Sequence, residues 1–417
     1  MIIIHAVNGY HILPRLLRDI LAFALESFPV VVLTGSRQTG KSTLLLGLGE
    51  QDSRSYLTLD DLDVLERARQ EPDALVRSAA RVALDEVQRS PDLLLAVKRA
   101  VDERRVPGQF ILTGSANLLL MRRVSETLAG RAIHLALWPM ARGEQLGLGA
   151  AGSWSSLFEV EDAGWPHLLG GGDPRGHPEE DWRALARRGG YPVPARIKQP
   201  AARSLWFEGY ARTYLERDLQ DLSSISSLVD FRRLMRACCL RLGSPVNQTE
   251  LGRDVGLPQP TVHRYLDLLE TSYQLVRVPA FSVNRTKRLV KAPKLYWCDT
   301  GLALHLAGEE DPRGAHLENL VLADLLTWRD SQVTRPEVLY WRTTTGEEVD
   351  FVLEWKGRLL PVEVKASAQP RFADARGLTA FRKEYPDQTR AGLLLHTGPE
   401  ISWIADGVLA APWWRVF

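Results

Sequence analysis

The first 145 residues alternate between short apolar runs and amphipathic stretches. Residues 12–28 have the spacing of an amphipathic helix, and residues 29–48 predict a buried strand, a glycine-bearing loop and a helix. Further short apolar runs, separated by helical patterns, occupy residues 55–59, 82–87, 109–114 and 133–137. A β-branched strand that feeds a loop and a helix is typical of a parallel sheet covered by helices. We therefore predict a doubly wound α/β domain over residues 1–145.

The rest of the chain has a different texture. Residues 146–178 are rich in glycine and predict an irregular insert, and helical patterns then extend to residue 240. A helix-turn-helix pattern followed by strand-like residues covers 241–294. From residue 295 to 417 the pattern is mixed α and β, and it predicts consecutive strands at 337–342, 348–355 and 358–366.

Composition excludes several classes of protein. The 417 residues include 52 Lys+Arg and 51 Asp+Glu, so the chain is not uniformly basic, although a local basic patch remains possible. The 3 cysteines exclude a disulfide scaffold and have no zinc-ligand spacing. No apolar run reaches the roughly 18 residues of a membrane helix, and the first residues do not resemble a signal peptide. We expect a cytoplasmic protein with no membrane partner.

A phosphate-binding loop is the most specific motif. Residues 35–42 match G-x-x-x-x-G-K-[ST] at every fixed position, between a predicted strand and a predicted helix. The glycines let backbone N–H groups surround phosphates at the start of a helix. Lys41 is expected to reach the β- and γ-phosphates and Ser42 to hold Mg²⁺, so the predicted cofactors are ATP and Mg²⁺. The predicted nucleotide-binding residues are Gly35, Ser36, Arg37, Gln38, Thr39, Gly40, Lys41, Ser42 and Thr43.

Acidic and polar residues at later strand ends complete the predicted ATPase site. Asp85 is expected in the Mg²⁺ shell and Glu86 beside the attacking water, a pair that favours hydrolysis over kinase-type transfer. Thr113 or Ser115, at the end of the next strand, is a candidate sensor of the γ-phosphate. Arg131 is a candidate arginine finger for a neighbouring subunit. The alternative for Arg131 is a surface side chain stabilised by a helix dipole.

The order of P-loop, Asp-Glu pair, T-G-S strand and L-A-G-R segment resembles the AAA+ ATPases. More narrowly, it is similar to the bacterial and archaeal branch that joins an AAA ATPase to a DUF4143 domain. This resemblance implies a nucleotide-dependent homo-oligomeric ring, with a hexamer favoured. The segment from Arg188 to Pro192 resembles the start of the family's helical lid, which places an insert and lid over 146–240.

Residues 249–270 have helix-turn-helix texture, followed by a predicted wing hairpin. Residues 241–294 contain 9 Lys+Arg and 4 Asp+Glu, a surplus of 9 − 4 = +5, in a chain of net charge +1. A concentrated basic patch indicates a polyanionic partner, and we expect salt-sensitive contacts to the DNA backbone, with branched duplex as a candidate form. The alternative is a packing or protein-docking module. The candidate DNA-binding residues are Thr261, His263, Arg264, Arg285, Lys287 and Arg288.

The last domain carries a set of carboxylates. Glu363 and Lys365 are two apart on a predicted strand, so both side chains emerge on one face, and Asp350 lies on the preceding strand. Two carboxylates and a lysine can hold Mg²⁺ and orient a water, with Glu318 as a further ligand. This layout resembles the PD-(D/E)xK nucleases. The alternative is an inactive nuclease fold in which Glu363 and Lys365 merely pair.

The predicted fold class is therefore α/β. It comprises a P-loop AAA+-like ATPase domain with a parallel sheet (1–145), an insert and helical lid (146–240), a winged helix (241–294) and an α/β nuclease-like domain (295–417). The predicted function is ATP hydrolysis by a ring-forming motor that acts on DNA. Two alternatives stay open. One is a nucleotide-gated regulatory or defence switch with slow turnover, and the other is a metal-dependent nuclease licensed by ATP.

Overall fold

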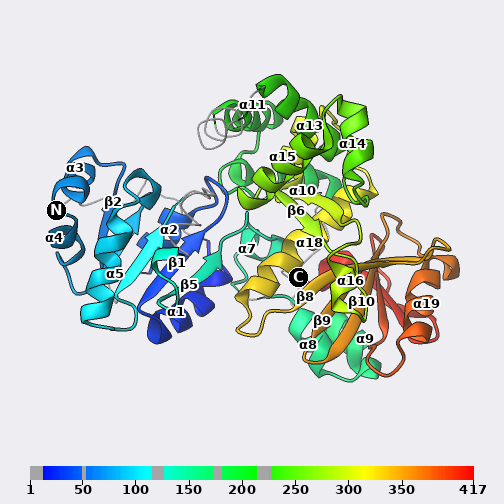
Figure 1. Ribbon diagram of the computed structural model, residues 1–417. Coiled ribbons are helices and arrows are strands. Elements are labelled where there is room, and N and C mark those ends of the chain that lie inside the picture. The colour runs from blue at the N-terminus through cyan, green and yellow to red at the C-terminus, as the bar shows by residue number, and fades with distance from the viewer. Residues whose placement is uncertain are drawn as a thin grey trace.

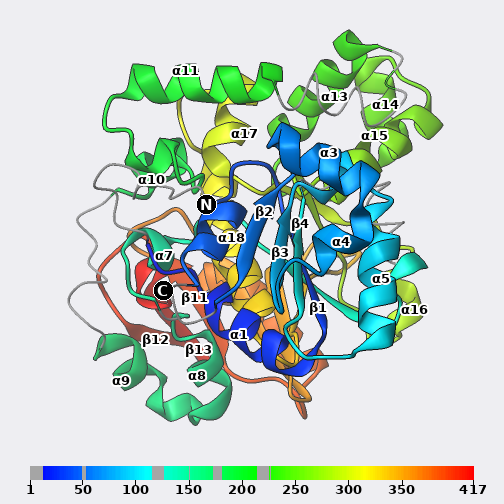
Figure 2. The same ribbon diagram turned by 90° about the vertical axis from the view of Figure 1, so that its left-hand side faces the viewer.

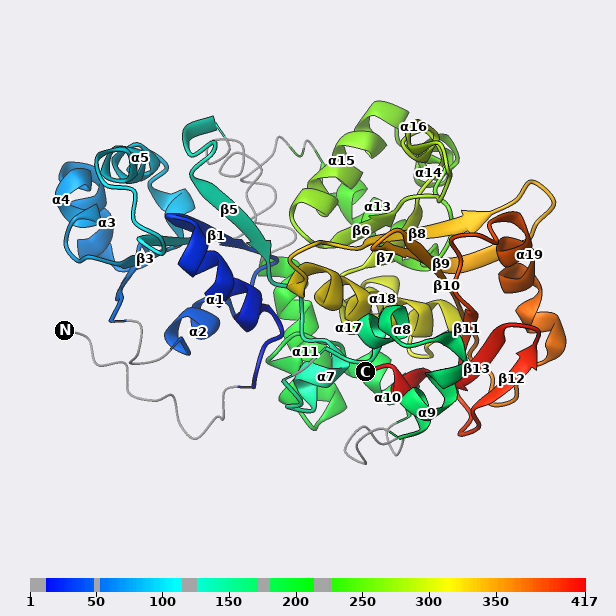
Figure 3. The same cartoon turned by 90° about the horizontal axis from the view of Figure 1, so that it is seen from below.

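The computed structural model describes residues 13–48, 53–114, 126–149, 151–171, 181–213, 225 and 227–417. The N-terminal domain, blue to cyan, lies on one side of the molecule, and the green to red elements form a second body beside it (Figure 1). The view from below shows the same two-part arrangement, with β5 directed toward the junction (Figure 3). In the described part of the chain, no helix is both long and apolar enough to span a bilayer.

The N-terminal domain is built on a five-stranded sheet of order β2-β3-β4-β1-β5 in which every pairing is parallel. Its strands are β1 (Val30–Thr34), β2 (Ser55–Thr58), β3 (Val82–Asp85), β4 (Phe110–Thr113) and β5 (Ala132–Ala136). Its helices are α1 (Leu17–Ser27), α2 (Lys41–Leu46), α3 (Leu62–Gln70), α4 (Pro72–Val76) and α5 (Leu93–Glu103). The predicted doubly wound α/β arrangement and its strands are confirmed.

Apolar layers cover both faces of this sheet. On one face, α3, α4 and α5 pack against Val30, Val32 and Leu84. On the other, α1 and α2 pack against Val31 and Leu33. All five residues of β1 are buried, as expected for a central parallel strand of β-branched residues. The buried sheet fixes the position of the loop that follows β1.

A helical layer follows in sequence and lies above the N-terminal sheet in the turned view (Figure 2). Its helices are α10 (Trp182–Arg188), α11 (Pro200–Tyr210), α13 (Leu228–Leu240), α14 (Gln248–Val255), α15 (Gln259–Thr271) and α17 (Thr300–Ala307). The Asn247 side chain caps α14, and Gly256 ends it in the left-handed conformation (φ 68°). The predicted helix-turn-helix is thus confirmed as α14 and α15.

The wing strands β6 (Leu275–Val278) and β7 (Lys294–Trp297) pair in antiparallel fashion. Their long connection contains the short helix α16 (Arg285–Arg288) and crosses to the C-terminal sheet. There the Phe281 N–H donates to Tyr340 O at 2.5 Å, and the Phe281 ring packs against Phe381. The winged helix and the C-terminal domain are therefore joined through this connection.

The C-terminal domain contains a six-stranded sheet of order β12-β13-β11-β10-β9-β8. The strands are β8 (Glu337–Arg342), β9 (Glu348–Trp355), β10 (Arg358–Val364), β11 (Gly392–His396), β12 (Ser402–Ala405) and β13 (Val408–Pro412). The three strands predicted from sequence are confirmed as β8, β9 and β10, which pair in antiparallel fashion. Helix α18 (Gly314–Ser331) covers one face and α19 (Arg376–Glu384) the other.

Residues 151–171, within the range expected to form the insert and lid, pack on this C-terminal sheet. They form α8 (Trp154–Glu159) and α9 (Trp165–Gly170). The Ser153 N–H donates to Val416 O at 2.8 Å, and the indole N–H of Trp154 donates to the buried Asp324 carboxylate at 2.6 Å. The small helix α7 (Arg142–Gln145) connects this region to β5.

Candidate nucleotide-binding site

The loop between β1 and α2 has the backbone of a phosphate cradle. Gly35 has a φ of 142°, and a Cβ there would overlap the carbonyl oxygen of Leu137, so glycine is required. Gln38 and Gly40 also have positive φ angles, of 62° and 93°. The Lys41 ammonium folds back onto this loop and donates to Gly35 O at 3.1 Å and Ser36 O at 2.9 Å. The loop is thus held in a wrapped conformation by the lysine expected to bind phosphate.

Lys41 is only 7% exposed. Burial lowers its pKa from 10.5 to about 8, although the negative charges of Glu86 and Asp85 partly oppose this. A bound phosphate would bring compensating negative charge to the ammonium. The loop therefore holds a lysine whose charged form is less favoured than in water, and a bound phosphate would favour that form again.

Asp85, at the end of β3, is the centre of a hydrogen-bond network. Its Oδ2 accepts from the Ser42 hydroxyl at 2.6 Å and from the Tyr56 hydroxyl at 2.5 Å, and its Oδ1 accepts from Thr113. The carboxyl ends of neighbouring parallel strands meet here, which explains why residues distant in sequence converge. Ser42, Asp85 and Thr113, expected in one site, lie together, whereas Ser115 lies outside the described residues.

Tyr56 was not identified from the sequence. It lies on β2, next to β3, and its pKa is raised by burial and by its hydrogen bond to Asp85. No motif marks this tyrosine. The only available signal was its position in a predicted strand of the same sheet.

Glu86 occupies a strained backbone position directly after Asp85. Its φ of 58° and ψ of 40° are left-handed, a conformation uncommon for residues other than glycine and often retained at functional sites. The Gln88 side chain donates to its carboxylate. Glu86 thus stands at the sheet edge beside the hydrogen-bonded pair Ser42 and Asp85, where the sequence predicts the base for water.

The second body contacts the outer side of the loop through three tyrosines. The Tyr191 hydroxyl donates to Ser36 Oγ at 3.1 Å, and the Tyr210 hydroxyl donates to Arg37 O at 3.3 Å. The Thr34 hydroxyl donates to Leu135 O at 3.1 Å, so the Tyr273 hydroxyl, 2.8 Å away, donates to Thr34. We call Tyr191, Tyr210 and Tyr273 the tyrosine contact. Tyr273 follows α15, so the winged helix itself touches the end of β1.

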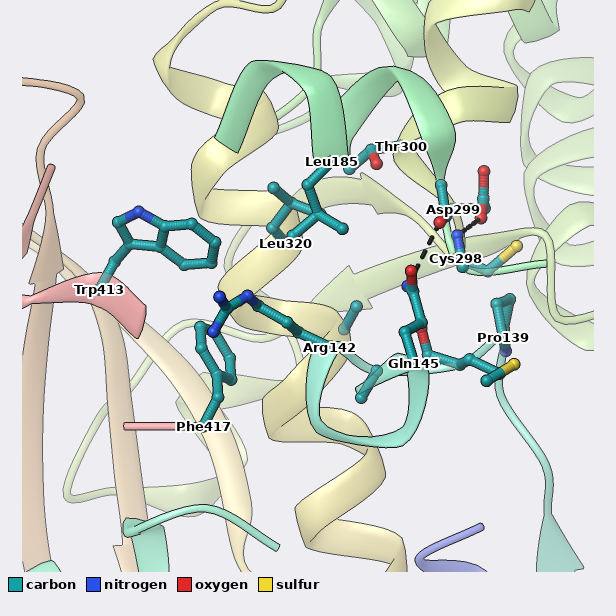
Figure 4. A pocket seen from close by; sticks show the side chains of 15 residues that line it. Pro139, Arg142, Gln145, Leu185, Cys298, Asp299, Thr300, Leu320, Trp413 and Phe417 are labelled. Atoms are coloured by element: carbon teal, nitrogen blue, oxygen red, sulfur yellow. Dashed lines mark hydrogen bonds between the residues drawn. The ribbon is translucent and has the colours of Figure 1, made fainter. Parts of the chain in front are cut away.

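Tyr191 belongs to the segment that resembles the start of the family's lid. Asp299 fixes this segment, because its Oδ2 accepts from Gly190 N at 2.5 Å and from Tyr191 N at 3.2 Å. The Oδ1 of the same carboxylate accepts from Leu302 N at 2.8 Å and caps α17. A small cavity adjoins this junction, and Figure 4 shows Gln145 near Asp299 on one side of it and Arg142 beside Trp413 on the other.

Arg131 lies at the other end of the N-terminal sheet. It immediately precedes β5, whose first residue pairs with the first residue of β1, so it is at the edge opposite the phosphate loop. Its guanidinium forms two hydrogen bonds with Asp102, of 2.5 and 3.0 Å. Arg131 therefore does not contribute to the nucleotide site of its own chain.

The candidate DNA-binding residues are in two different settings. On α15, His263 and Arg264 are exposed and Thr261 is half-buried. His263 lies 3.2 Å from Asp267, and the Arg264 guanidinium lies over the Tyr265 ring at 5.2 Å. This face matches the exposed side of the predicted second helix.

Two basic residues of the wing connection, Arg285 and Arg288, pair with the C-terminal sheet instead. Arg288 is only 8% exposed and pairs with Glu337 at 2.7 Å and Glu354 at 2.8 Å. Arg285 is exposed and also pairs with Glu354, at 3.0 Å. Lys287 is exposed as well. Arg288 thus has a structural partner where the sequence suggested DNA. The local charge count omitted its partners, because Glu337 and Glu354 lie 49 and 66 residues further along the chain.

The carboxylates of the C-terminal domain also come together. Lys365 pairs with Glu363 at 2.5 Å, Asp350 lies near both, and Glu318 lies near Lys365. Burial, with the nearby negative charge of Asp350, raises the pKa of Glu318 and of Glu363. In the described residues, no group of three His, Cys, Asp or Glu side chains has an arrangement that holds a metal ion. The nuclease-like layout is therefore present, but the described residues include no group of three such side chains around one point.

The all-parallel sheet, with a glycine-rich loop after its central strand, defines a P-loop ATPase domain. Family models agree. An "AAA domain" model matches residues 27–146, and two domains of unknown function, DUF8612 and DUF4143, match 179–313 and 313–416. The chain belongs to the proteins that join an AAA ATPase domain to a DUF4143 domain, which confirms the resemblance seen in the sequence.

Several relatives share nearly the whole chain. Uncharacterized proteins of Mycobacterium tuberculosis and Mycobacterium bovis are each 29% identical over 401 residues, covering 93% of this chain and 81% of theirs. An uncharacterized protein of Haemophilus influenzae is 20% identical over 393 residues, covering 88% of this chain and 90% of its own.

Two solved structures are also similar. A Walker-type ATPase of Pyrococcus abyssi has a TM-score of 0.43 and 17% identity, covering 69% of this chain and 94% of its own. Aquifex aeolicus DnaA bound to AMPPCP has a TM-score of 0.28 and 17% identity, covering 60% and 86%.

Proposed function

We propose that this chain binds and hydrolyses Mg²⁺-ATP and acts as a nucleotide-gated switch. Nucleotide at the loop would change how the second body packs on the ATPase domain. The observation that carries this proposal is the tyrosine contact, because Tyr191 and Tyr273 hydrogen-bond directly to residues at the start of the phosphate loop. Since Ser36 is in the loop, a change in loop conformation there would alter the bond to Tyr191.

The residues at the loop suit each part of the reaction. The Ser42 hydroxyl and the Asp85 carboxylate are adjacent oxygen ligands of the kind that Mg²⁺ prefers, so they would hold the ion, which neutralises phosphate charge when bound. Lys41 would leave the carbonyls of Gly35 and Ser36 and turn to the phosphates. Glu86 would orient and deprotonate the attacking water.

The gating follows from the position of the Lys41 ammonium. Its ammonium satisfies two loop carbonyls, so binding phosphate frees them. Ser36 both contributes one of these carbonyls and accepts the Tyr191 bond through its hydroxyl. Tyr191 is in turn held by Asp299 at the start of α17. A contiguous set of hydrogen bonds thus joins the phosphate loop to the helices of the second body.

A second candidate function is action on DNA as a ring-forming motor. The exposed His263 and Arg264 on the second helix of a helix-turn-helix favour it. In such a ring, Arg131 would leave Asp102 and reach the nucleotide of a neighbouring subunit.

One experiment separates the two functions. ATP hydrolysis and oligomeric state would be measured with and without linear and four-way-junction DNA. The switch predicts assembly or dissociation on adding ATP, with turnover unchanged by DNA. The motor predicts DNA-stimulated turnover that is lost in Arg264→Ala.

Controls make the result specific. Lys41→Ala should abolish both ATP hydrolysis and the change in oligomeric state on adding ATP. Lys383→Ala, on the exposed face of α19, should leave both intact. A Lys41→Ala protein that still hydrolyses ATP at the wild-type rate would overturn the proposed site.

A further inference from the structure

Lys294 is the most deeply buried lysine among the described residues of the second body. It begins β7, in the wing, and is only 1% exposed. Its ammonium lies 2.9 Å from Asp350 Oδ1 and also pairs with Glu348, on the strand β9 of the C-terminal sheet. Burial alone would lower the pKa of such a lysine, but the negative charges of Asp350, Glu318 and Glu348 outweigh burial and raise the pKa.

The carboxylates around Lys294 are those that the sequence suggested as metal ligands. Asp350 uses its second oxygen to accept from Val364 N at 3.0 Å. Glu318 accepts from the Tyr296 hydroxyl at 3.0 Å, and Glu363 binds Lys365 through Oε1. Glu363 Oε2 has no hydrogen-bond partner among the described residues. Each of the three carboxylates therefore already has a partner from the protein.

We propose that the Lys294 ammonium occupies the position of a divalent cation in this cluster. The cluster then acts as a joint between the wing strand β7 and the C-terminal sheet and is not a metal-dependent nuclease centre. A second positive charge beside the ammonium would be repelled, so a metal ion would have to displace a lysine that is held by two carboxylates. The residues present do not fit the second Mg²⁺ suggested by the sequence.

A second contact supports the role of a joint. Arg288, from the connection between β6 and β7, pairs with Glu337 and Glu354 on the strands β8 and β9. The wing is thus attached to the C-terminal sheet by ion pairs at two separate places. This inference goes beyond the proposed nucleotide switch and does not depend on ATP binding.

The test is to remove the ammonium and ask whether a metal ion takes its place. Lys294→Ala leaves the buried Asp350 carboxylate without its cation, whereas Glu348 keeps Arg342 at 3.6 Å, so the melting temperature should fall. Mn²⁺ should raise it again and should bind, by titration calorimetry, at least about tenfold more tightly than to wild type. Lys294→Ala combined with Asp350→Asn should lose this Mn²⁺ effect.

Controls and opposing outcomes are equally definite. Lys356→Ala removes an exposed lysine that pairs with Glu159, and it should show no Mn²⁺ rescue. If Lys294→Ala does not fold, Lys294→Gln keeps a neutral polar side chain and is tested in the same way. Mn²⁺ binding by wild type that Asp350→Asn abolishes would overturn the proposal. So would a folded Lys294 variant that gains no Mn²⁺ affinity.

Discussion

Lys41 should couple nucleotide binding to proton uptake. Its ammonium is buried against the carbonyls of Gly35 and Ser36, and burial lowers its pKa to about 8. Bound phosphates would supply negative charge next to this ammonium and raise the pKa well above 8. A lysine that is partly deprotonated before binding must then take up a proton when nucleotide binds.

The magnitude follows from the pKa. At pH 8 about half of the Lys41 side chains are neutral, so binding should take up about 0.5 proton per site, and at pH 6.5 less than about 0.1. The same shift links stability to pH. Since the folded pKa is below the unfolded value of 10.5, the unfolded chain binds more protons between these values, so stability rises from about pH 8 to about pH 10.5. The gain from this residue approaches about 3 kcal/mol.

Titration calorimetry of ADP with excess Mg²⁺ in two buffers of different ionisation enthalpy measures the proton uptake. At pH 8 the apparent binding enthalpy should differ between the buffers, and at pH 6.5 the difference should nearly vanish. For stability, Lys41→Met should be more stable than wild type at pH 7.5, and the two proteins should converge toward pH 10.5. Buffer-independent enthalpy at pH 8, with normal binding, would refute the inference that Lys41 is partly neutral in the empty loop.

Three further predictions follow from single contacts. Gly35→Ala should lower nucleotide affinity by at least about tenfold, measured by calorimetry, because the new Cβ would overlap Leu137 O; an unchanged affinity would contradict the loop geometry. Tyr273→Phe should lower the free energy of unfolding in urea by about 1 kcal/mol through the lost bond to Thr34, and it should weaken the change in oligomeric state on adding ATP. A variant whose oligomeric state still responds fully to ATP would show that this contact does not transmit nucleotide binding. Thermal melting should show Asp324→Asn to be more stable than wild type at pH 8 but not at pH 4. Burial raises the Asp324 pKa to about 7, so the stability of the wild-type protein falls as pH rises from 3.8 to 7. A variant that is destabilised at pH 8 would mean that the charged carboxylate stabilises the fold.

The sequence was sufficient for the elements that depend on local pattern. The strand, glycine loop and helix at residues 29–48 are specified by apolar runs and by a motif whose glycines have a direct backbone purpose, as Gly35 illustrates. The helix-turn-helix was equally predictable, because Gly256 has the positive φ of a helix end and Leu266 faces the core. Predicting these features requires only the residues that are close to them in the sequence.

The tyrosine contact was not predictable for the opposite reason. Tyr191 and Tyr273 lie 155 and 239 residues from their partners Ser36 and Thr34, and a tyrosine in an apolar stretch has no periodic signal that distinguishes a core residue from a contact. Only the docking of the second body on the ATPase domain creates these bonds. Tyr56 was missed in the same way, since its partner Asp85 is on the neighbouring strand.

The charge surplus of residues 241–294 shows what a local count omits. Arg277 pairs within the region, with Asp267 and Glu270, but Arg288 and Lys294 pair with carboxylates of the C-terminal sheet, which the count did not include. Arg285 adds another such pair, with Glu354.

Three of the positive charges that suggested a polyanion are therefore matched by Glu337, Glu348, Asp350 and Glu354 in the folded chain. The exposed basic residues of the region that form none of these pairs include Arg253, Arg264, Lys287 and Lys291, so DNA contact would depend mainly on them. Fewer phosphate contacts mean a shallower dependence of DNA affinity on salt than the surplus of +5 implies. A measured log–log slope steeper than about −4 would require the wing arginines to leave their carboxylates when DNA binds.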